Sequence, residues 1–317
     1  MPNGIMPARD LMAILPEAIL TVAGVVVMLV GAFRKEGGGR WCSTATFVGL
    51  LGAAIAVGYQ WRHQGSAFDG MIQADLFSIF FHLLFLIIAA LVALSSVDYL
   101  RMEKLPAGEY YALLLFATVG MGLMASAGEL ILAFIGLEIS SLSSYVLVGF
   151  RRGIATSSES ALKYFLLGSF ATAFLLYGIA LMFGATGTTR LTQIRAALEG
   201  SQNPVSAAGP GSNLLSGLAA AQSVQPFPDN QFPTALVSLS IALIFVGLAF
   251  KVSAAPFQIW TPDVYQGAPT PVTAFLSTGP KAAAFAVFLR VFQVALESSA
   301  PEWSALLWVS GALSMFL

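Results

Sequence analysis

The stretch of sequence that decides the fold runs from Gly247 to Phe285 and reads GLAFKVSAAPFQIWTPDVYQGAPTPVTAFLSTGPKAAAF. An apolar run of helical length carries Lys251 close to its end, and Pro256 follows five residues later. Proline has no N–H and its ring crowds the carbonyl four residues back, so we predict that the helix breaks here. A broken membrane helix is tolerated only where protein or a water-filled cavity satisfies the exposed backbone. The stretch therefore favours an ion path over simple packing.

The second half of this stretch carries a second lysine in another long apolar run. Pro262 lies in the short segment after the break, and Lys281 follows directly after Pro280 near the middle of the second run. We expect Pro280 to free the carbonyl of Leu276, four residues earlier. Pro256, Pro262 and Pro280 are therefore the residues that we assign to helix breaks.

The composition is that of a membrane protein. Of 317 residues, 57% are hydrophobic and 10% are charged, against about 25% charged in ordinary soluble domains. The net charge of −1 gives no basic surface for nucleic acid. One cysteine, Cys42, and two histidines, His63 and His82, are too few for an iron–sulfur cluster or a typical zinc site. No phosphate-binding glycine motif is present either, so we expect no cofactor and no metal in this chain.

Apolar runs of about 20 residues are long enough to cross the hydrocarbon core of a bilayer. The sequence predicts eight passages and the start of a ninth, in an all-α polytopic membrane protein. They are Leu11–Phe33, Trp41–Tyr59, Leu76–Val97, Tyr110–Ala127, Leu130–Phe150, Ser158–Phe183, the broken segment Thr234–Tyr265, Thr270–Leu296, and a ninth that begins near Trp303. The positive flank of the first run, Arg34, Lys35 and Arg40, lies after it, and the run lacks a small-residue cleavage site, so we expect a transmembrane helix and not a signal peptide.

The distribution of Lys and Arg predicts the orientation. The connections after the first, third and fifth passages hold Arg34, Lys35, Arg40, Arg101, Lys104, Arg151 and Arg152, whereas the opposite side holds only Arg9, Arg62, Arg190 and Arg195. The first set should be cytoplasmic, which leaves the N-terminus outside. The long sixth connection opens with Leu191, Ile194 and Leu198 at helical spacing, which indicates a short interfacial helix before a flexible linker.

Five ionisable side chains lie inside predicted membrane segments, where each costs roughly 2.5–3.5 kcal/mol on insertion scales. They are Glu138, Lys163, Lys251, Lys281 and Arg290. Such residues usually mark a proton or ion pathway. Glu138 and Lys163 form either a structural ion pair or a lysine whose proton affinity is tuned by a movable carboxylate. For Lys251 and Lys281, the alternative to proton exchange is a lysine that extends along the helix to the interface.

Other charged and polar residues are secondary candidates. His82 is more often a satisfied core histidine than a relay member. Arg290 stands one and a half turns from Glu297, and it either extends outward to the interface or has a functional role. Asp263 is expected to cap or pair locally within the helix break. Glu17, Asp75 and Asp98 stand near helix ends, where a structural role is expected.

Three stretches carry a resemblance to a known family: GLEISSLSSYVLVGF at 136–150, SESALKYFLLGSFATAFLLYGIAL at 158–181, and the stretch at 247–285. Together they resemble subunit N of bacterial respiratory complex I, the NADH:quinone oxidoreductase. The wider antiporter-like family also includes complex I subunits L and M and Mrp-type sodium/proton antiporter subunits. The similarity runs over nearly the whole chain.

The resemblance implies fourteen transmembrane helices built as two inverted five-helix repeats, each with one discontinuous helix. By motif position, Glu138 corresponds to the family's helix-five glutamate, Lys163 to its helix-six partner, Lys251 to the lysine of the broken helix seven, and Lys281 to the central lysine of helix eight. The implied domains are helices one to three at 1–103, the first repeat at 104–297 with the linker at 184–233, and the start of helix nine at 298–317. Most of the second repeat is absent, so we expect a truncated form.

The leading functional hypothesis is a proton-translocating membrane-arm subunit of NADH:quinone oxidoreductase in a bacterial inner membrane. The resemblance places NADH, FMN, iron–sulfur clusters and quinone in partner subunits, and neighbours that resemble subunits K and M beside this one in the bilayer. It implies a non-redox subunit of an enzyme complex. The alternatives are a monovalent cation/proton antiporter subunit of the Mrp type and a non-catalytic assembly scaffold.

Overall fold

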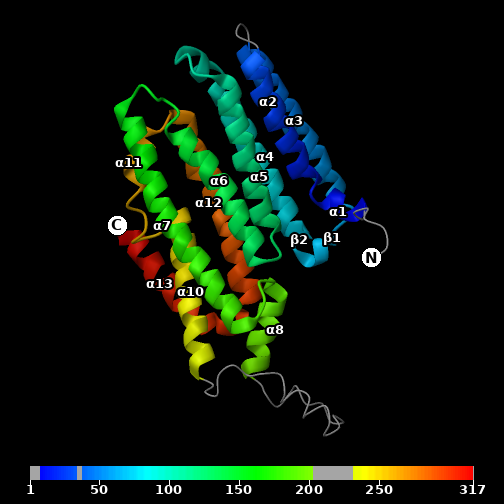
Figure 1. Cartoon of the computed structure of the whole chain (residues 1–317), viewed down its shortest axis with the longest axis vertical. Helices are drawn as coiled ribbons and strands as arrows, with labels where there is room; N and C mark the ends of the chain where they lie inside the picture. The colour runs from blue at the N-terminus through cyan, green and yellow to red at the C-terminus, as the bar shows by residue number, and fades with distance from the viewer. Residues whose placement is uncertain (1–7, 34–37, 203–230, 317) are drawn as a thin grey trace.

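The computed structural model describes residues 8–33, 38–202 and 231–316. Within these ranges, eight helices are long and apolar enough to cross a membrane. This result confirms the all-α, polytopic fold class. The helices stand side by side in one bundle, with α2 and α3 at one edge and α7, α10 and α13 at the other (Figure 1).

The helices follow the predicted apolar runs closely. Their bounds are α1 Ala8–Ala13, α2 Leu15–Phe33, α3 Gly38–Gln60, α4 Leu76–Met102, α5 Ala107–Ser126, α6 Leu130–Val148, α7 Ala155–Thr186, α8 Leu191–Gln202, α10 Gln231–Val252, α11 Thr261–Gly267, α12 Thr270–Leu289 and α13 Ala300–Phe316. The many apolar side chains that remain exposed on this bundle, such as Phe170 and Ile55, are those expected of a surface solvated by lipid.

The predicted break after Lys251 is confirmed. Helix α10 ends at Val252, one residue after the lysine, and α11 begins only at Thr261. Pro256 lies inside the non-helical segment between them. Pro262 instead occupies the first turn of α11, a position where the missing N–H costs nothing, so it starts a helix and does not break one.

Pro280 does not break its helix, contrary to the sequence-based expectation. Helix α12 continues through it from Thr270 to Leu289. Neighbouring helices allow such a proline in a membrane helix, because they re-satisfy the freed backbone groups. The irregularity comes ten residues later, where a π-helix spans Arg290–Ala295. A further short 3₁₀ helix spans Glu297–Ser299.

A small β-hairpin between α3 and α4 was not predicted. Strand β1, Gly65–Ala67, pairs antiparallel with β2, Ile72–Ala74. The Asp69–Gly70 pair in the turn is the sequence signal that could have revealed it. The hairpin supports the tight connection between α5 and α6, since the N–H of Gly128 donates to the carbonyl of Met71 at 2.7 Å.

The predicted interfacial helix in the sixth connection is confirmed as α8. Leu191, Ile194 and Leu198 are its buried face, and the helix packs against the π-helix. Helix α8 therefore shortens the predicted linker at 184–233, of which residues 203–230 lie outside the described residues. Helix α8, the hairpin and α1 lie at one end of the bundle, and α11 lies at the other (Figure 1).

Candidate functional site

Lys251 points into the protein and does not extend to the interface. Only 6% of the residue is exposed. Its ammonium donates a hydrogen bond to the Ser141 hydroxyl at 2.7 Å and a longer one to the Tyr145 hydroxyl at 3.4 Å. Both acceptors belong to α6. A buried ammonium is therefore held by neutral hydroxyls rather than by a carboxylate.

Aromatic rings complete the surroundings of this ammonium. The Nζ atom lies 5.3 Å from the ring centroid of Tyr145 and 5.7 Å from that of Tyr164. These distances fall within the range of a cation–π interaction, which strengthens where water is excluded. Trp260, from the helix break, stacks on Tyr164 at 4.6 Å and donates its indole N–H to the carbonyl of Phe250. The break thus supplies a wall of the site.

Glu138 lies on the same helix as the two hydroxyl groups, one turn before Ser141. It interacts electrostatically with Lys251. Its Oε1 atom is buried and has no hydrogen-bond partner among the described residues. A buried carboxylate oxygen without a partner indicates a site that water or a moving proton serves. Glu138 and Lys251 therefore face one functional site, with Ser141 and Tyr145 beside them.

The serines that follow Glu138 divide between two uses. The hydroxyls of Ser141, Ser143 and Ser144 all donate to backbone carbonyls four residues earlier, within α6. Such bonds satisfy a serine inside a helix. Ser141 also accepts the bond from Lys251, so it is the one of these three serines that takes part in the site.

Lys281 contacts the same aromatic cluster through Tyr265. It is half-buried on α12, and its ammonium lies 5.4 Å from the ring centroid of Tyr265. Tyr265 in turn packs edge-to-face against Trp260, with centroids 6.1 Å apart. Lys251 and Lys281 are therefore linked by a continuous group of aromatic rings from α6, α7 and the broken helix.

The segment that follows Lys251 carries several buried polar atoms. Four side-chain atoms of the break and of α11 are buried without a hydrogen-bond partner among the described residues: Ser253 Oγ, Gln258 Oε1, Thr261 Oγ1 and Tyr265 OH. Buried polar groups are nearly always satisfied by protein or ordered water. These unpartnered atoms therefore indicate bound water along the break and α11, as the broken helix predicts.

Lys163 does not contact Glu138, contrary to the expected pairing. Its ammonium lies 2.7 Å from Asp263 Oδ2 and 2.9 Å from Glu159 Oε1, and 44% of the side chain is exposed. Glu138, on α6, interacts electrostatically with Lys251 instead. The expectation that Asp263 pairs locally is also wrong, because its partner is 100 residues away on α7. The ion pair joins α11 to α7.

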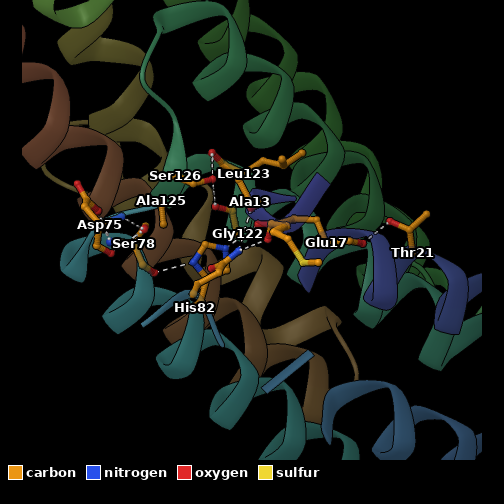
Figure 2. Close-up of polar contacts among 12 residues, drawn as sticks. Ala13, Glu17, Thr21, Asp75, Ser78, His82, Gly122, Leu123, Ala125 and Ser126 are labelled. Atoms are coloured by element: carbon orange, nitrogen blue, oxygen red, sulfur yellow. Dashed lines mark hydrogen bonds and ion pairs between the residues drawn. The ribbon is translucent and has the colours of Figure 1, made fainter. Parts of the chain in front are cut away.

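His82 is a satisfied core histidine, as expected, but its partner was missed. Its Nδ1 atom lies 2.6 Å from the carbonyl oxygen of Ser78, and its Nε2 atom lies 2.6 Å from Glu17 Oε1. Glu17, on α2, is 4% exposed. Figure 2 shows the imidazole between these two groups. The charge of Glu17 inside an apolar run was the available signal.

Arg290 does not extend outward towards Glu297. It is 8% exposed, and its guanidinium binds both carboxylate oxygens of Asp75, at 3.0 and 2.7 Å. Its Nε atom donates to the carbonyl of Ala125 at 2.6 Å. Glu297 instead pairs with Arg195. Asp75 also caps α4, where it accepts the N–H of Ser78 at 2.8 Å, so the structural role expected for Asp75 is confirmed.

No group of three or more His, Cys, Asp or Glu side chains that could hold a metal ion occurs among residues 8–33, 38–202 and 231–316. Cys42 is buried and not in a disulfide. Partly buried or buried cations and hydroxyl groups are the chemistry that the site offers.

Comparison with known proteins identifies the family. The transmembrane family of NADH:quinone oxidoreductase and the Mrp antiporter matches residues 127–317. NADH-quinone oxidoreductase subunit N 2 of Koribacter versatilis is 46% identical over 98% of this chain and 58% of its own length. Subunit N 1 of Solibacter usitatus is 44% identical over 97% of this chain and 57% of its own length. The chain thus spans somewhat more than half the length of these relatives.

Solved structures agree with this result. A chain of respiratory complex I from Thermus thermophilus matches with a TM-score of 0.64 at 37% identity, over 87% of this chain and 53% of that one. A chain of the Mrp complex from Dietzia matches at a TM-score of 0.64 and 22% identity, over 93% and 50%, and shows the shared fold. The resemblance to subunit N is confirmed, and the chain belongs to the NADH:quinone oxidoreductase/Mrp antiporter family of transmembrane proteins.

Proposed function

We propose that this chain is a proton-translocating part of a subunit N, in the membrane arm of a NADH:quinone oxidoreductase. The observation that carries the proposal is the buried ammonium of Lys251, held by two hydroxyls at the edge of a broken helix. An ionisable group at bilayer depth without a hydrogen-bonded counter-ion is a functional site by default. The relatives named subunit N support the choice of enzyme.

Proton transfer in this proposal uses the groups that face one another in the structure. Lys251 receives a proton while Glu138, with its free oxygen, stabilises the positive charge. The unpartnered polar atoms between Ser253 and Tyr265 then support water-mediated transfer towards Lys281. Moving one charge against 100 mV requires about 2.3 kcal/mol, which corresponds to a change of about two pKa units at one site.

Lys163 takes a different part from the one first expected. Its ion pair with Asp263 holds α11 against α7 in this structure, and α11 continues from the break that borders Lys251. A change in this pair would therefore move the wall of the Lys251 site. We propose that Asp263, and not Glu138, is the carboxylate that engages Lys163 in this state.

The remaining assignments rest on the distribution of Lys and Arg and on the resemblance to subunit N. We propose a bacterial inner membrane with the N-terminus on the periplasmic side, and membrane-arm neighbours that resemble subunits K and M. NADH, FMN, iron–sulfur clusters and quinone would be bound by partner subunits, so that this subunit carries no redox step of its own.

The test is a Lys251→Ala variant in the assembled complex, reconstituted into sealed vesicles. We expect proton transport per NADH oxidised to fall severalfold or more, because the buried group that carries the proton is removed. Lys104→Ala is the matched control, since Lys104 is exposed at the end of α4. Normal proton transport by Lys251→Ala would refute the proposal.

The same vesicles separate the two alternatives. Sodium-dependent proton flux without NADH oxidation would indicate an Mrp-type antiporter subunit. A Glu138→Gln variant with unchanged proton transport, in a complex that fails to assemble when the chain is deleted, would indicate a scaffold.

A further inference from the structure

A second buried, protonatable pair lies outside the Lys251 site. Glu17 of α2 and His82 of α4 are 4% and 6% exposed, and their side chains meet at 2.6 Å between Oε1 and Nε2. Figure 2 shows the two side chains, Glu17 from α2 and His82 from α4, pointing towards each other. Neither residue contacts the groups around Lys251 in any bond described above, so the proposed function does not explain them.

The hydrogen bonds determine how many protons this pair holds. The carbonyl oxygen of Ser78 can only accept, so His82 Nδ1 at 2.6 Å must carry a hydrogen. In a neutral imidazole, Nε2 is then an acceptor and faces the carboxyl of Glu17. A carboxylate and a bare nitrogen lone pair would repel each other at 2.6 Å. One further proton must therefore lie between Glu17 and His82.

We propose that Glu17 and His82 form a second proton-binding site, which holds one exchangeable proton between α2 and α4. This proton can be bound either to the Glu17 carboxyl or to His82 Nε2, and the total charge of the pair is the same in both cases. When it moves from the Glu17 carboxyl to His82, the O–H bond breaks and an N–H bond forms at Nε2, which gives a carboxylate and an imidazolium. The pair is neutral in either arrangement, and it becomes negative only when it gives the proton up.

The surroundings leave room for this exchange. Glu17 Oε2 is buried and has no hydrogen-bond partner among the described residues. A cavity of about 10 Å³ lies against Glu17, His82, Thr118 and Gly122, which is at the lower limit for one water molecule. Water there would have polar partners in the carboxyl group and the Thr118 hydroxyl.

A permanent ion pair fixes the site in place. Arg290 and Asp75 bind at the N-terminus of α4, and Asp75 also holds the N–H of Ser78, whose carbonyl orients His82. Arg290 is the other charged group that acts on His82. Its charge is balanced by Asp75, so Glu17 remains the group that directly shares a proton with the histidine. The site thus lies where α2, α4, α5 and the π-helix meet.

The first test is ¹⁵N magnetic resonance on the full chain in lipid nanodiscs, labelled with ¹⁵N-histidine. The sequence has two histidines, so a His63→Gln background leaves His82 as the single imidazole. We expect Nδ1 to be protonated and Nε2 to show a proton shared with the carboxyl, and we expect the shared-proton signal to vanish in Glu17→Gln. A neutral ring with its proton on Nε2 and a bare Nδ1 in the unmodified pair would overturn the proposal, even if Glu17→Gln does not fold.

The second test asks whether the site exchanges its proton during turnover, and this step rests on the proposed function. In the assembled complex, Glu17→Gln should lower proton transport per NADH about 10²-fold or more, since positioned proton-transfer groups contribute about 10²–10⁴-fold to rates. Glu103→Gln, an exposed carboxyl after α4, is the matched control. If Glu17→Gln transports protons as the wild type does while Lys251→Ala does not, proton exchange by the Glu17–His82 pair during turnover is refuted and the proposed function is not. Wild-type transport by Lys251→Ala would refute the proposed function, while the magnetic resonance result stands by itself.

Discussion

Two buried cations of this chain are held in opposite ways. Arg290 is 8% exposed and binds a carboxylate through two hydrogen bonds and a carbonyl through a third. Lys251 is 6% exposed and has two neutral hydroxyls and a set of aromatic rings. Burial is the same, but the compensation of charge differs.

The difference matches what each side chain can do. A guanidinium stays charged at all accessible pH values, so its burial requires a permanent counter-ion, and the Asp75 carboxylate supplies one. An ammonium can lose its proton, so hydroxyls and rings can serve both its charged and its neutral forms. The Arg290 region therefore fixes geometry, and the Lys251 region can change charge.

The largest effect is expected when Lys251 is replaced by a cation that cannot release its proton. In Lys251→Arg the positive charge is kept but cannot be released, because a guanidinium stays protonated at all accessible pH values. We expect proton transport per NADH to fall at least as far as in Lys251→Ala, while the complex still assembles. The measurement is proton uptake into vesicles, with Lys104→Arg as the control. Transport near the wild-type level would show that release from this position is not required.

The second prediction concerns Arg290 and removes the charge of its partner, Asp75. Asp75→Asn should lower the free energy of unfolding by about 1–2 kcal/mol. This value lies at the lower end of the range for hydrogen bonds to charged groups, because Asp75 is half-exposed. Thermal unfolding in detergent, followed by tryptophan fluorescence, measures it. The double variant Asp75→Asn/Arg290→Met should recover part of the loss, because no unpaired charge then remains buried.

The same carboxylate predicts a pH dependence. Partial burial raises the pKa of Asp75, but the hydrogen bond and charge of Arg290 and the N–H of Ser78 outweigh burial and leave the pKa below its ordinary value of 3.8. A group whose pKa is lower in the folded chain stabilises it above the ordinary value and loses this contribution as the pH falls through the lowered one. The stability difference between wild type and Asp75→Asn should therefore stay constant from neutral pH to about pH 4 and shrink below it. A difference that grew on acidification would contradict the ion pair.

The sequence predicted what depends on local pattern. The eight spans follow from apolar runs of about 20 residues, and the break after Lys251 follows from Pro256, since both effects act within one helix. The burial of Leu191, Ile194 and Leu198 was readable from helical spacing.

The partners of the charged groups were not readable in the same way. Arg290 and Asp75 are 215 residues apart, and Lys163 and Asp263 are 100 apart. Such pairings depend on which helices are neighbours, and spacing within one helix carries no information about that. Spacing within the helix therefore places Arg290 near Glu297, whereas its carboxylate partner is Asp75. The roles of Glu138, Lys251 and Lys281 in proton transfer stay predictions.

The third prediction sharpens the contrast at the Glu17–His82 pair, which lies next to the Arg290 region. A Cβ at position 122 would lie 3.0 Å from Glu17 Oε1 and 3.1 Å from His82 Nε2. Gly122→Ala should therefore separate the pair and remove the shared-proton signal. Overpacking and the better helix propensity of alanine should nearly cancel, to within about 1–2 kcal/mol. Gly184→Ala is the matched control, because nothing lies within 4 Å of its Cβ in α7, and it should leave the signal unchanged.

The smallest effect is expected for the cation that is not buried. Lys163 meets Asp263 at 2.7 Å, but their side chains are 44% and 52% exposed, so water and salt screen the pair. A double-mutant cycle with Lys163→Met and Asp263→Asn should give a coupling in thermal stability that disappears at high salt. Proton transport is the more informative measurement, because Asp263 lies on α11 and its release would shift the wall of the Lys251 site. Unchanged transport in both single variants would mean that α11 keeps its position without this pair. The charge-changing region would then depend on Glu138 and on the hydroxyls and rings around Lys251.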